Sequence, residues 1–200
     1  MINRWSHSRL STYESCPKKA FYRYVKKHPE ESHPAAKRGI KIHKLAEQYI
    51  KGALPEVPKE LYLFYEGFEQ LREDYEKGDV CVEEQWAFNL SWEKTDWDSE
   101  DTWGRYIVDA FVQEGTKGKV IDFKTGRYKE YNENYRNQCA LYACCVFNRF
   151  SELETIQTEL WYLDHHKITR YSFTRKEAEE TQKDFHKRGL AMTTDELFAT

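Results

Sequence analysis

Two apolar runs separated by a turn constrain the fold of this chain more than any other stretch. The first run is Gly104–Glu114, rich in β-branched and aromatic residues, and the second is Val120–Lys124. Both compositions are typical of β-strands. The connection contains Gly115 and Gly118, and glycine readily takes the positive φ angles that tight hairpin turns require. The sequence therefore predicts two adjacent strands joined by a tight turn.

Three charged side chains lie in this predicted hairpin. Asp122 and Lys124 are two residues apart, so on a strand they point to the same face. Asp109 stands in an otherwise apolar strand, where an unpaired carboxylate is costly to bury. A divalent cation between the two aspartates would relieve that cost, and Mg²⁺ or Mn²⁺ suits oxygen ligands. A lysine beside such a metal fits phosphodiester hydrolysis. A plain aspartate–lysine ion pair on a half-exposed sheet is the alternative.

The composition indicates a folded domain without a membrane segment. The 200 residues predict one domain, and 14 Tyr, 11 Phe and 6 Trp argue against disorder. No apolar run approaches the ~18 residues of a membrane span, and the N-terminus has no apolar region typical of a secretory signal. The five cysteines form an odd number with no framework spacing. They favour a reducing compartment.

The near-neutral net charge of −3 conceals an asymmetry along the chain. Residues 1–51 carry a net charge of +8, residues 52–114 carry −12, and residues 115–200 carry +1. A basic N-terminal third beside an acidic middle is compatible with a track for a polyanion leading to a metal site. Cations interleaved with aromatic residues can grip a nucleic-acid strand. Solvated helix faces are the alternative. The cations concerned are Lys18, Lys19 and Arg23.

Residues 1–78 are predicted to form a helical N-terminal part. A helix from about Ala35 to Lys51 carries an apolar stripe that includes Ile40, and His43 lies on that stripe. A lone histidine on an apolar helix face is more often a hydrogen-bonded core residue than a ligand. The spacing by itself therefore leaves both roles open for His43.

Residues 79–174 are predicted to form a sheet core that contains a helix over 132–150. In the strand that begins near Val80, Glu83 and Glu84 point to opposite faces, so only one of them could approach a metal.

The helix over 132–150 places Gln138 and Tyr142, four residues apart, on one face. A capping box predicts a last helix over 175–190. This order of helices and strands indicates an α/β (α+β) fold with a central mixed sheet flanked by helices, and an N-terminal helical segment.

Five motifs in order along the chain resemble the RecB-like exonuclease branch of the PD-(D/E)xK nuclease superfamily, which includes phage exonucleases and CRISPR-associated relatives. The opening motif is similar to Ser8-x-Leu10-x-x-Tyr13-x-x-Cys16-Pro17, and Gly39-x-x-x-His43 resembles the family's metal-binding histidine helix. Two stretches resemble the family's core motifs: Gly104-Arg-Tyr-Ile-Val-Asp109 and Val120-Ile-Asp122-Phe-Lys124-Thr-Gly126. The stretch Gln138-x-x-x-Tyr142 resembles its RecB signature.

The resemblance implies a role for each matching residue. His43, Asp109 and Asp122 would bind Mg²⁺ or Mn²⁺ together with the main-chain oxygen of Phe123. Asp109, Asp122 and Lys124 would form the catalytic set, with Lys124 positioning the hydrolytic water. The members that would contact DNA are Gln138 and Tyr142, and Glu84 or Glu83 would be an additional acid.

Many relatives hold a [4Fe–4S] cluster with one cysteine in the opening motif and three after the last helix. Cys16 is in place, but no cysteine follows Cys145. A four-thiolate cluster in that layout is therefore not expected from this chain. Either this member lacks the cluster, or the segment that carries it lies beyond these residues.

Together these features predict a metal-dependent DNA exonuclease that acts on single strands or duplex ends in recombination, repair or DNA processing. A non-catalytic nucleic-acid-binding module that kept the nuclease fold is the alternative. The expected partner is DNA, with a homo-oligomer or a processing protein as a further possibility and no membrane. The expected location is the cytoplasm of a prokaryotic cell or a phage-infected host.

Overall fold

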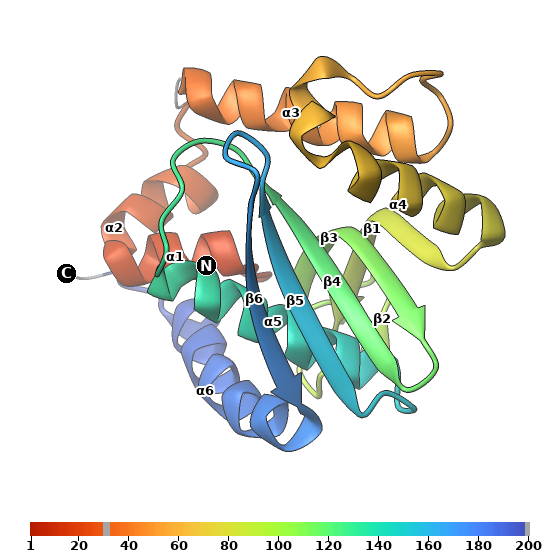
Figure 1. Ribbon diagram of the computed structural model, residues 1–200. Helices are drawn as coiled ribbons and strands as arrows, with labels where there is room; N and C mark the ends of the chain where they lie inside the picture. The colour runs from red at the N-terminus through yellow and green to blue at the C-terminus, as the bar shows by residue number, and fades with distance from the viewer. Residues whose placement is uncertain (30–32, 199–200) are drawn as a thin grey trace.

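A six-stranded mixed sheet, ordered β2-β1-β3-β4-β5-β6, runs through the centre of the computed structural model (Figure 1), which describes residues 1–29 and 33–198. Neighbouring strands are antiparallel except for β4 and β5, which are parallel and are joined through a helix, as a parallel pair requires. The strands are β1 Val80–Phe88, β2 Lys94–Thr95, β3 Gly104–Glu114, β4 Lys117–Lys124, β5 Thr155–Tyr162 and β6 Lys167–Thr174.

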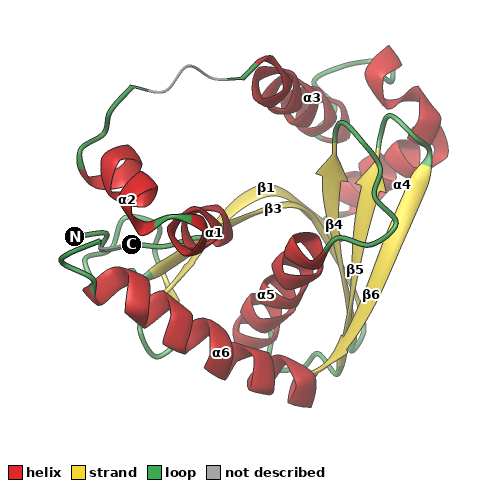
Figure 2. Cartoon of the chain, turned by 90° about the vertical axis from the view of Figure 1, so that its left-hand side faces the viewer, coloured by secondary structure: helices red, strands yellow, loops and turns green. Residues whose placement is uncertain are grey.

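Helices cover both faces of the sheet, so the molecule has three layers (Figure 2). Helices α3 and α4 pack on one face, and α5 and α6, with α1, pack on the other. Each face has its own apolar core. The helical segments are α1 His7–Ser15, α2 Pro17–Ala20, the π-helical turn η1 Phe21–Val25, α3 Pro34–Ile50, the 3₁₀ segment η2 Lys59–Phe64, α4 Tyr65–Lys77, α5 Glu133–Arg149 and α6 Arg175–Thr194.

The predicted hairpin is present as β3 and β4. Glu114 pairs with Lys117 across the turn, and Gly115 there has a φ of 59°. Glycine takes this left-handed conformation without the clash that a Cβ atom causes. The two runs therefore form neighbouring strands in the middle of the sheet, and their carboxylates lie on adjacent elements.

The side chains of β1 and β3 change to the other face of the sheet between the pairs Val82–Ala110 and Glu84–Val108, where Glu83 and Asp109 lie. Val82 packs with α3 and α4, whereas Trp86 packs on the opposite face of the sheet. On a regular strand, two residues that are four apart would point to the same face. Glu83 has a φ of 51°, which for a residue other than glycine costs about 1 kcal/mol or more. The reversal turns the carboxylates of Glu83 and Asp109 toward α3, as their contacts with His43 show.

The α/β fold class with a mixed sheet is confirmed, and two details of the prediction are wrong. Ile40 is not on the buried face of its helix, because its side chain is 70% exposed; the buried face of α3 consists of Ile42, Ala46, Tyr49 and Ile50. The last helix continues past residue 190 to Thr194, where a threonine hydroxyl bonds back to a carbonyl one turn earlier. No helix in the described ranges is long and apolar enough to cross a membrane.

Candidate active site

Helix α3 is held against the ends of β4 and β5, and this position sets the place of His43. Arg38 makes two hydrogen bonds to Asp164, at 2.8 and 2.5 Å, and the same carboxylate accepts the backbone N–H of Gly126 at 2.8 Å. Gly39 faces the hydroxyl of Thr125 so closely that an added Cβ atom would lie 3.3 Å from it. The small residue therefore lets the helix approach the loop after β4.

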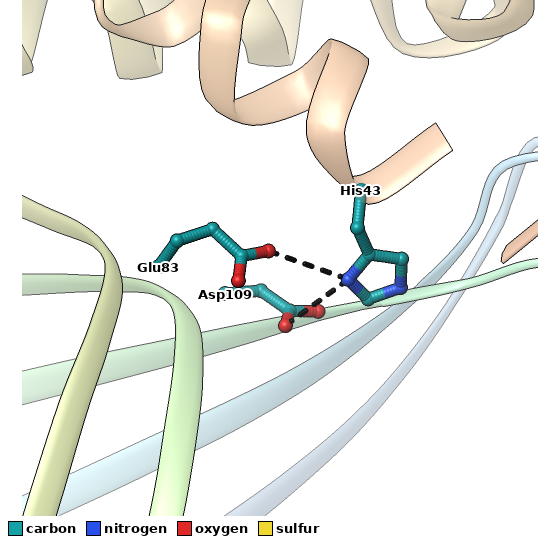
Figure 3. A group of neighbouring side chains, drawn as sticks. All are labelled: His43, Glu83 and Asp109. Atoms are coloured by element: carbon teal, nitrogen blue, oxygen red, sulfur yellow. Dashed lines mark ion pairs between the residues drawn. The ribbon is translucent and has the colours of Figure 1, made fainter. Parts of the chain in front are cut away.

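The imidazole of His43 lies among three oxygen acceptors, two of which, the carboxylates of Glu83 and Asp109, are drawn in Figure 3. Its Nδ1 is 3.3 Å from Asp109 Oδ1 and 3.4 Å from Glu83 Oε1, while its Nε2 is 2.9 Å from the backbone oxygen of Phe123. The second oxygen of Asp109 accepts the backbone N–H of Phe123 at 2.6 Å. Strand β4 therefore fixes both the carboxylate and the imidazole.

The two sides of this contact shift each other's proton affinity. Burial lowers the pKa of His43, but hydrogen bonds to Asp109 and Glu83 outweigh it and raise the pKa to about 10. Burial raises the pKa of Asp109 to about 6, with the charge of Asp122 acting in the same direction and His43 acting against it. The carboxylates thus favour the charged form of His43, whereas burial and then the charge of Asp122 disfavour the ionised form of Asp109.

Asp122 and Lys124 form a second polar network with helix α5. Lys124 Nζ lies 2.6 Å from Asp122 Oδ2 and donates to Gln138 Oε1 at 2.9 Å. Asp122 Oδ1 accepts from Gln138 at 3.1 Å and from the hydroxyl of Tyr142 at 3.0 Å. Tyr135, on the same helix, places its ring 4.5 Å from Lys124 Nζ.

This network holds the half-buried Lys124 side chain as an ammonium ion. Burial by itself would lower the pKa of Lys124, but the charge and the hydrogen bond of Asp122 raise it above its ordinary value. The lysine therefore stays charged at neutral pH, and its ammonium group faces the carboxylate side of the site.

The donor set suits a hard divalent cation. The ligand atoms of His43, Glu83 and Asp109 lie within 4.8 Å of one another. Glu83 Oε1 and Asp122 Oδ2 are buried, and each has a cationic neighbour: His43 Nδ1 lies 3.4 Å from the first and Lys124 Nζ lies 2.6 Å from the second. Buried carboxylate oxygens gathered in one place are the ligands that a hard divalent cation prefers. The residues present therefore fit a divalent metal.

These side chains lie in a cleft of about 1050 Å³. Its walls come from α1 and the residue stretch before it, α3, β1, β3, β4 and α5. Its polar and charged lining includes His7, Ser8, Arg9, His43, Lys44, Glu83, Arg105, Asp109, Asp122, Lys124, Asn134 and Gln138.

The structure separates the predicted site residues into two groups. The metal and catalytic candidates, with Gln138 and Tyr142, lie together in the cleft. Glu83 is the glutamate at His43, whereas Glu84 accepts a hydrogen bond from the indole of Trp86 at 2.6 Å. The predicted strand-binding cations, Lys18, Lys19 and Arg23, are exposed and are not among the residues that line the cleft.

The cleft also contains cations that sequence reasoning missed. Arg9 follows the serine of the opening motif, and Arg105 is the second residue of β3, the strand that carries Asp109. His7 lies near Lys124, and burial, followed by that lysine's charge, lowers its pKa to about 4. The sequence does contain a pattern that could have identified Arg105. It lies four residues before Asp109, and on a regular strand this even spacing places both side chains on the same face.

Comparisons with known proteins give the family of this chain. The family model described as the PD-(D/E)XK nuclease superfamily matches residues 4–200. The crystal structure of a "putative exonuclease" from Eubacterium rectale is similar with a TM-score of 0.55 and 13% identity, covering 96% of this chain and 82% of that chain. The structure of the protein SSO0001 gives a TM-score of 0.49 and 16% identity, covering 92% and 77%. The comparison with curated proteins gives no match. With a match over nearly its whole length, this chain belongs to the PD-(D/E)XK nuclease superfamily.

Proposed function

We propose that this protein is a metal-dependent DNA exonuclease that hydrolyses phosphodiester bonds of single strands or duplex ends. The observation that carries the proposal is the placement of the Asp122–Lys124 pair beside the His43–Glu83–Asp109 cluster in one cleft. Membership in the superfamily supports a nuclease that acts on nucleic acid through a divalent metal. The choice of DNA and of strand ends rests on the sequence motifs.

His43, Glu83 and Asp109 would hold the metal, and Asp122 and the oxygen of Phe123 lie at the same site. We propose Mg²⁺ or Mn²⁺, because three carboxylates and a carbonyl oxygen are the ligands these ions prefer. When bound, such an ion stabilises negative charge on a phosphoryl group and lowers the pKa of water. The structure supports Glu83 over Glu84 as the additional acid.

Lys124 is the residue that we propose to act on the reacting group. Its charged ammonium can donate a hydrogen bond to the attacking water and offset the charge that develops on the phosphoryl oxygens. Asp122 and Gln138 hold the ammonium at 2.6 and 2.9 Å, so it has little freedom to turn away. Tyr142 holds Asp122 in turn. Gln138 and Tyr142 would therefore position Lys124 and Asp122. Gln138 lines the cleft and would also contact the DNA.

The test is digestion of end-labelled single- and double-stranded DNA, linear and circular, with Mn²⁺, Mg²⁺ or EDTA. Lys124→Ala should reduce cleavage about 10²- to 10³-fold, the usual effect of removing a group that stabilises developing charge. Lys119→Ala is the matched control, because Lys119 lies on the same strand and outside the cleft lining.

Metal-dependent loss of linear DNA, with circles intact, would support an exonuclease. Cutting of circles would replace that part of the proposal with an endonuclease. DNA binding without cleavage under any of these conditions would instead favour a binding module that kept the nuclease fold.

A further inference from the structure

A second hollow of about 490 Å³ adjoins the cleft beyond the first turn of α1. Arg9 and Arg105 line both spaces, so the hollow continues the cleft away from the metal candidates. Its other lining residues are Met1, Ile2, Asn3, Arg4, Tyr24, Glu100 and Thr102. Three arginines and one carboxylate, Glu100, line the hollow, and this excess of positive charge favours an anionic ligand.

The charges in this place are not balanced. No carboxylate in the described ranges lies within ion-pair distance of Arg4 or Arg9, which instead donate to backbone oxygens. Arg105 pairs with Asp98 at 2.8 Å, but that aspartate is 86% exposed, so solvent screens the pair and the carboxylate offsets only part of the arginine's charge. Burial lowers the pKa of Arg9, and the charges of Arg105 and Arg4 add to the effect, although Tyr24 opposes it. An anion would relieve this repulsion.

Contacts with Trp97 hold the guanidinium group of Arg105 in a fixed position, where it could bind such a ligand. Its guanidinium lies 4.7 Å from the ring centre of Trp97 and donates to the backbone oxygen of that residue. Its Nε is buried and lacks a hydrogen-bond partner. A planar guanidinium fixed against an indole can donate to a phosphate with little loss of side-chain freedom. Trp97 is half-buried and also lines the cleft.

The spacing of Arg105 and Asp109 along β3 gives the distance between this hollow and the candidate metal ligands. Arg105 precedes Asp109 by four residues on one strand, which corresponds to about 13 Å. At the B-form rise of about 3.4 Å per nucleotide in one strand, this is at most about four nucleotide steps. A strand whose scissile phosphate lies at Asp109 would therefore bring a later phosphate to Arg105.

We propose that Arg105 and Arg9 form a second phosphate-binding subsite for the backbone of the nucleic-acid strand, with Trp97 beside it as a stacking surface for a base. The inference rests on the proposed nuclease function. Phosphate contact combined with aromatic stacking is a common way to bind single strands. The subsite would bind substrates that extend past the scissile bond and leave very short ones unaffected.

The first measurement is fluorescence anisotropy of labelled (dT)12 in EDTA, over a range of salt concentrations. Arg105→Gln should weaken binding about tenfold, the usual value of a charged hydrogen bond. It should also lower the magnitude of the salt slope by about 0.7, the value for one phosphate of a single strand. Arg72→Gln is the matched control, because Arg72 lies 5.1 Å from the Tyr49 ring and is 24% exposed, against 20% for Arg105.

A second variant keeps the test valid if Arg105→Gln does not fold. Asp98→Asn removes the competing carboxylate at an exposed position, so it should bind (dT)12 more tightly than the wild type does.

A third readout is cleavage with metal present. The loss of kcat/KM in Arg105→Gln should be about tenfold on (dT)12 and absent on (dT)3, a dependence on length that a merely structural role would not produce.

Binding by Arg105→Gln at wild-type affinity and salt slope would overturn the subsite. An equal loss on (dT)3 and (dT)12, or unchanged binding in Asp98→Asn, would also count against it. Binding of (dT)12 that depends on Arg105 in a protein that cleaves nothing would support the subsite and refute the nuclease proposal separately.

Discussion

A cation bound at the carboxylate cluster should stabilise the protein, and Asp109→Asn should abolish that stabilisation. The charges of Asp122 and Glu83 both act against the ionised form of buried Asp109, and a bound cation would offset that repulsion. The size of the effect follows from mass action, because a ligand at about 100 times its Kd stabilises a protein by about 2.7 kcal/mol. In a protein of 200 residues, about 3 kcal/mol corresponds to a Tm increase of about 6–12 °C.

The assay is thermal unfolding of metal-free protein, followed by circular dichroism, with Mg²⁺, Mn²⁺ or EDTA and without nucleic acid. Asp109→Asn keeps the shape of the side chain but removes its charge. Glu159→Gln is the matched control, because Glu159 is 6% exposed, against 7% for Asp109, and lies outside the cleft lining. The control should keep the full metal-dependent increase in Tm.

Two results would refute the reasoning. If the Tm of the wild type does not change with either cation at millimolar concentration, the cluster is a set of ion pairs without a metal. If Asp109→Asn shows the same increase as the wild type, the cation binds elsewhere. Both results are independent of any measurement of cleavage.

Three further predictions concern residues around the cleft. Tyr142→Phe removes a buried hydrogen bond to Asp122 and should lower the free energy of unfolding by about 1–3 kcal/mol; an unchanged denaturation midpoint would contradict it. Burial, then a nearby lysine, lowers the pKa of His7 to about 4, so the unfolded chain binds this proton more readily and stability falls as pH drops from about 6.5 to about 4. Between pH 7 and pH 5 the wild type should lose about 2 kcal/mol more than His7→Gln in urea unfolding, and equal losses would exclude the effect. In Gly104→Ala the added methyl group would overlap the Phe88 ring, so unfolding should become easier by about 1–3 kcal/mol, and a wild-type Tm would show that the ring moves without cost.

The hairpin and the fold class could be predicted from the sequence because they depend on local patterns. Strand composition, glycines in the turn and the order of elements are properties of short stretches, and the structure contains β3, β4 and the mixed sheet accordingly. Asp122 and Lys124 were expected on one face, and their charged atoms lie 2.6 Å apart. The roles of the site residues stay predictions.

The orientation of helix α3 could not be predicted in the same way. Its sequence has two overlapping apolar sets, and the set that includes Ile40 faces the cleft, whereas Ile42 and Ala46 face the core. Periodicity identifies an amphipathic helix but does not choose between two adjacent stripes. The clamp between Arg38 and Asp164, 126 residues apart, holds the observed orientation.

The choice between Glu83 and Glu84 depended on long-range packing. In the sequence, Val82, Glu84 and Trp86 alternate as one face of a regular strand, but β1 crosses over at Glu83, and Trp86 joins the opposite core. No local pattern records that crossing, because it arises from two helical layers that each require apolar contacts from the same strand.

The local chemistry of the chain thus determines its strands, its hairpin and the residue types of a candidate metal site. Which glutamate meets His43, and the joining of Arg9 to Arg105 at one hollow, depend on contacts between segments about 40 to 100 residues apart. Such contacts form only when the sheet bends and α1 and α3 pack at the cleft, and alternation or helical spacing within one segment does not encode them.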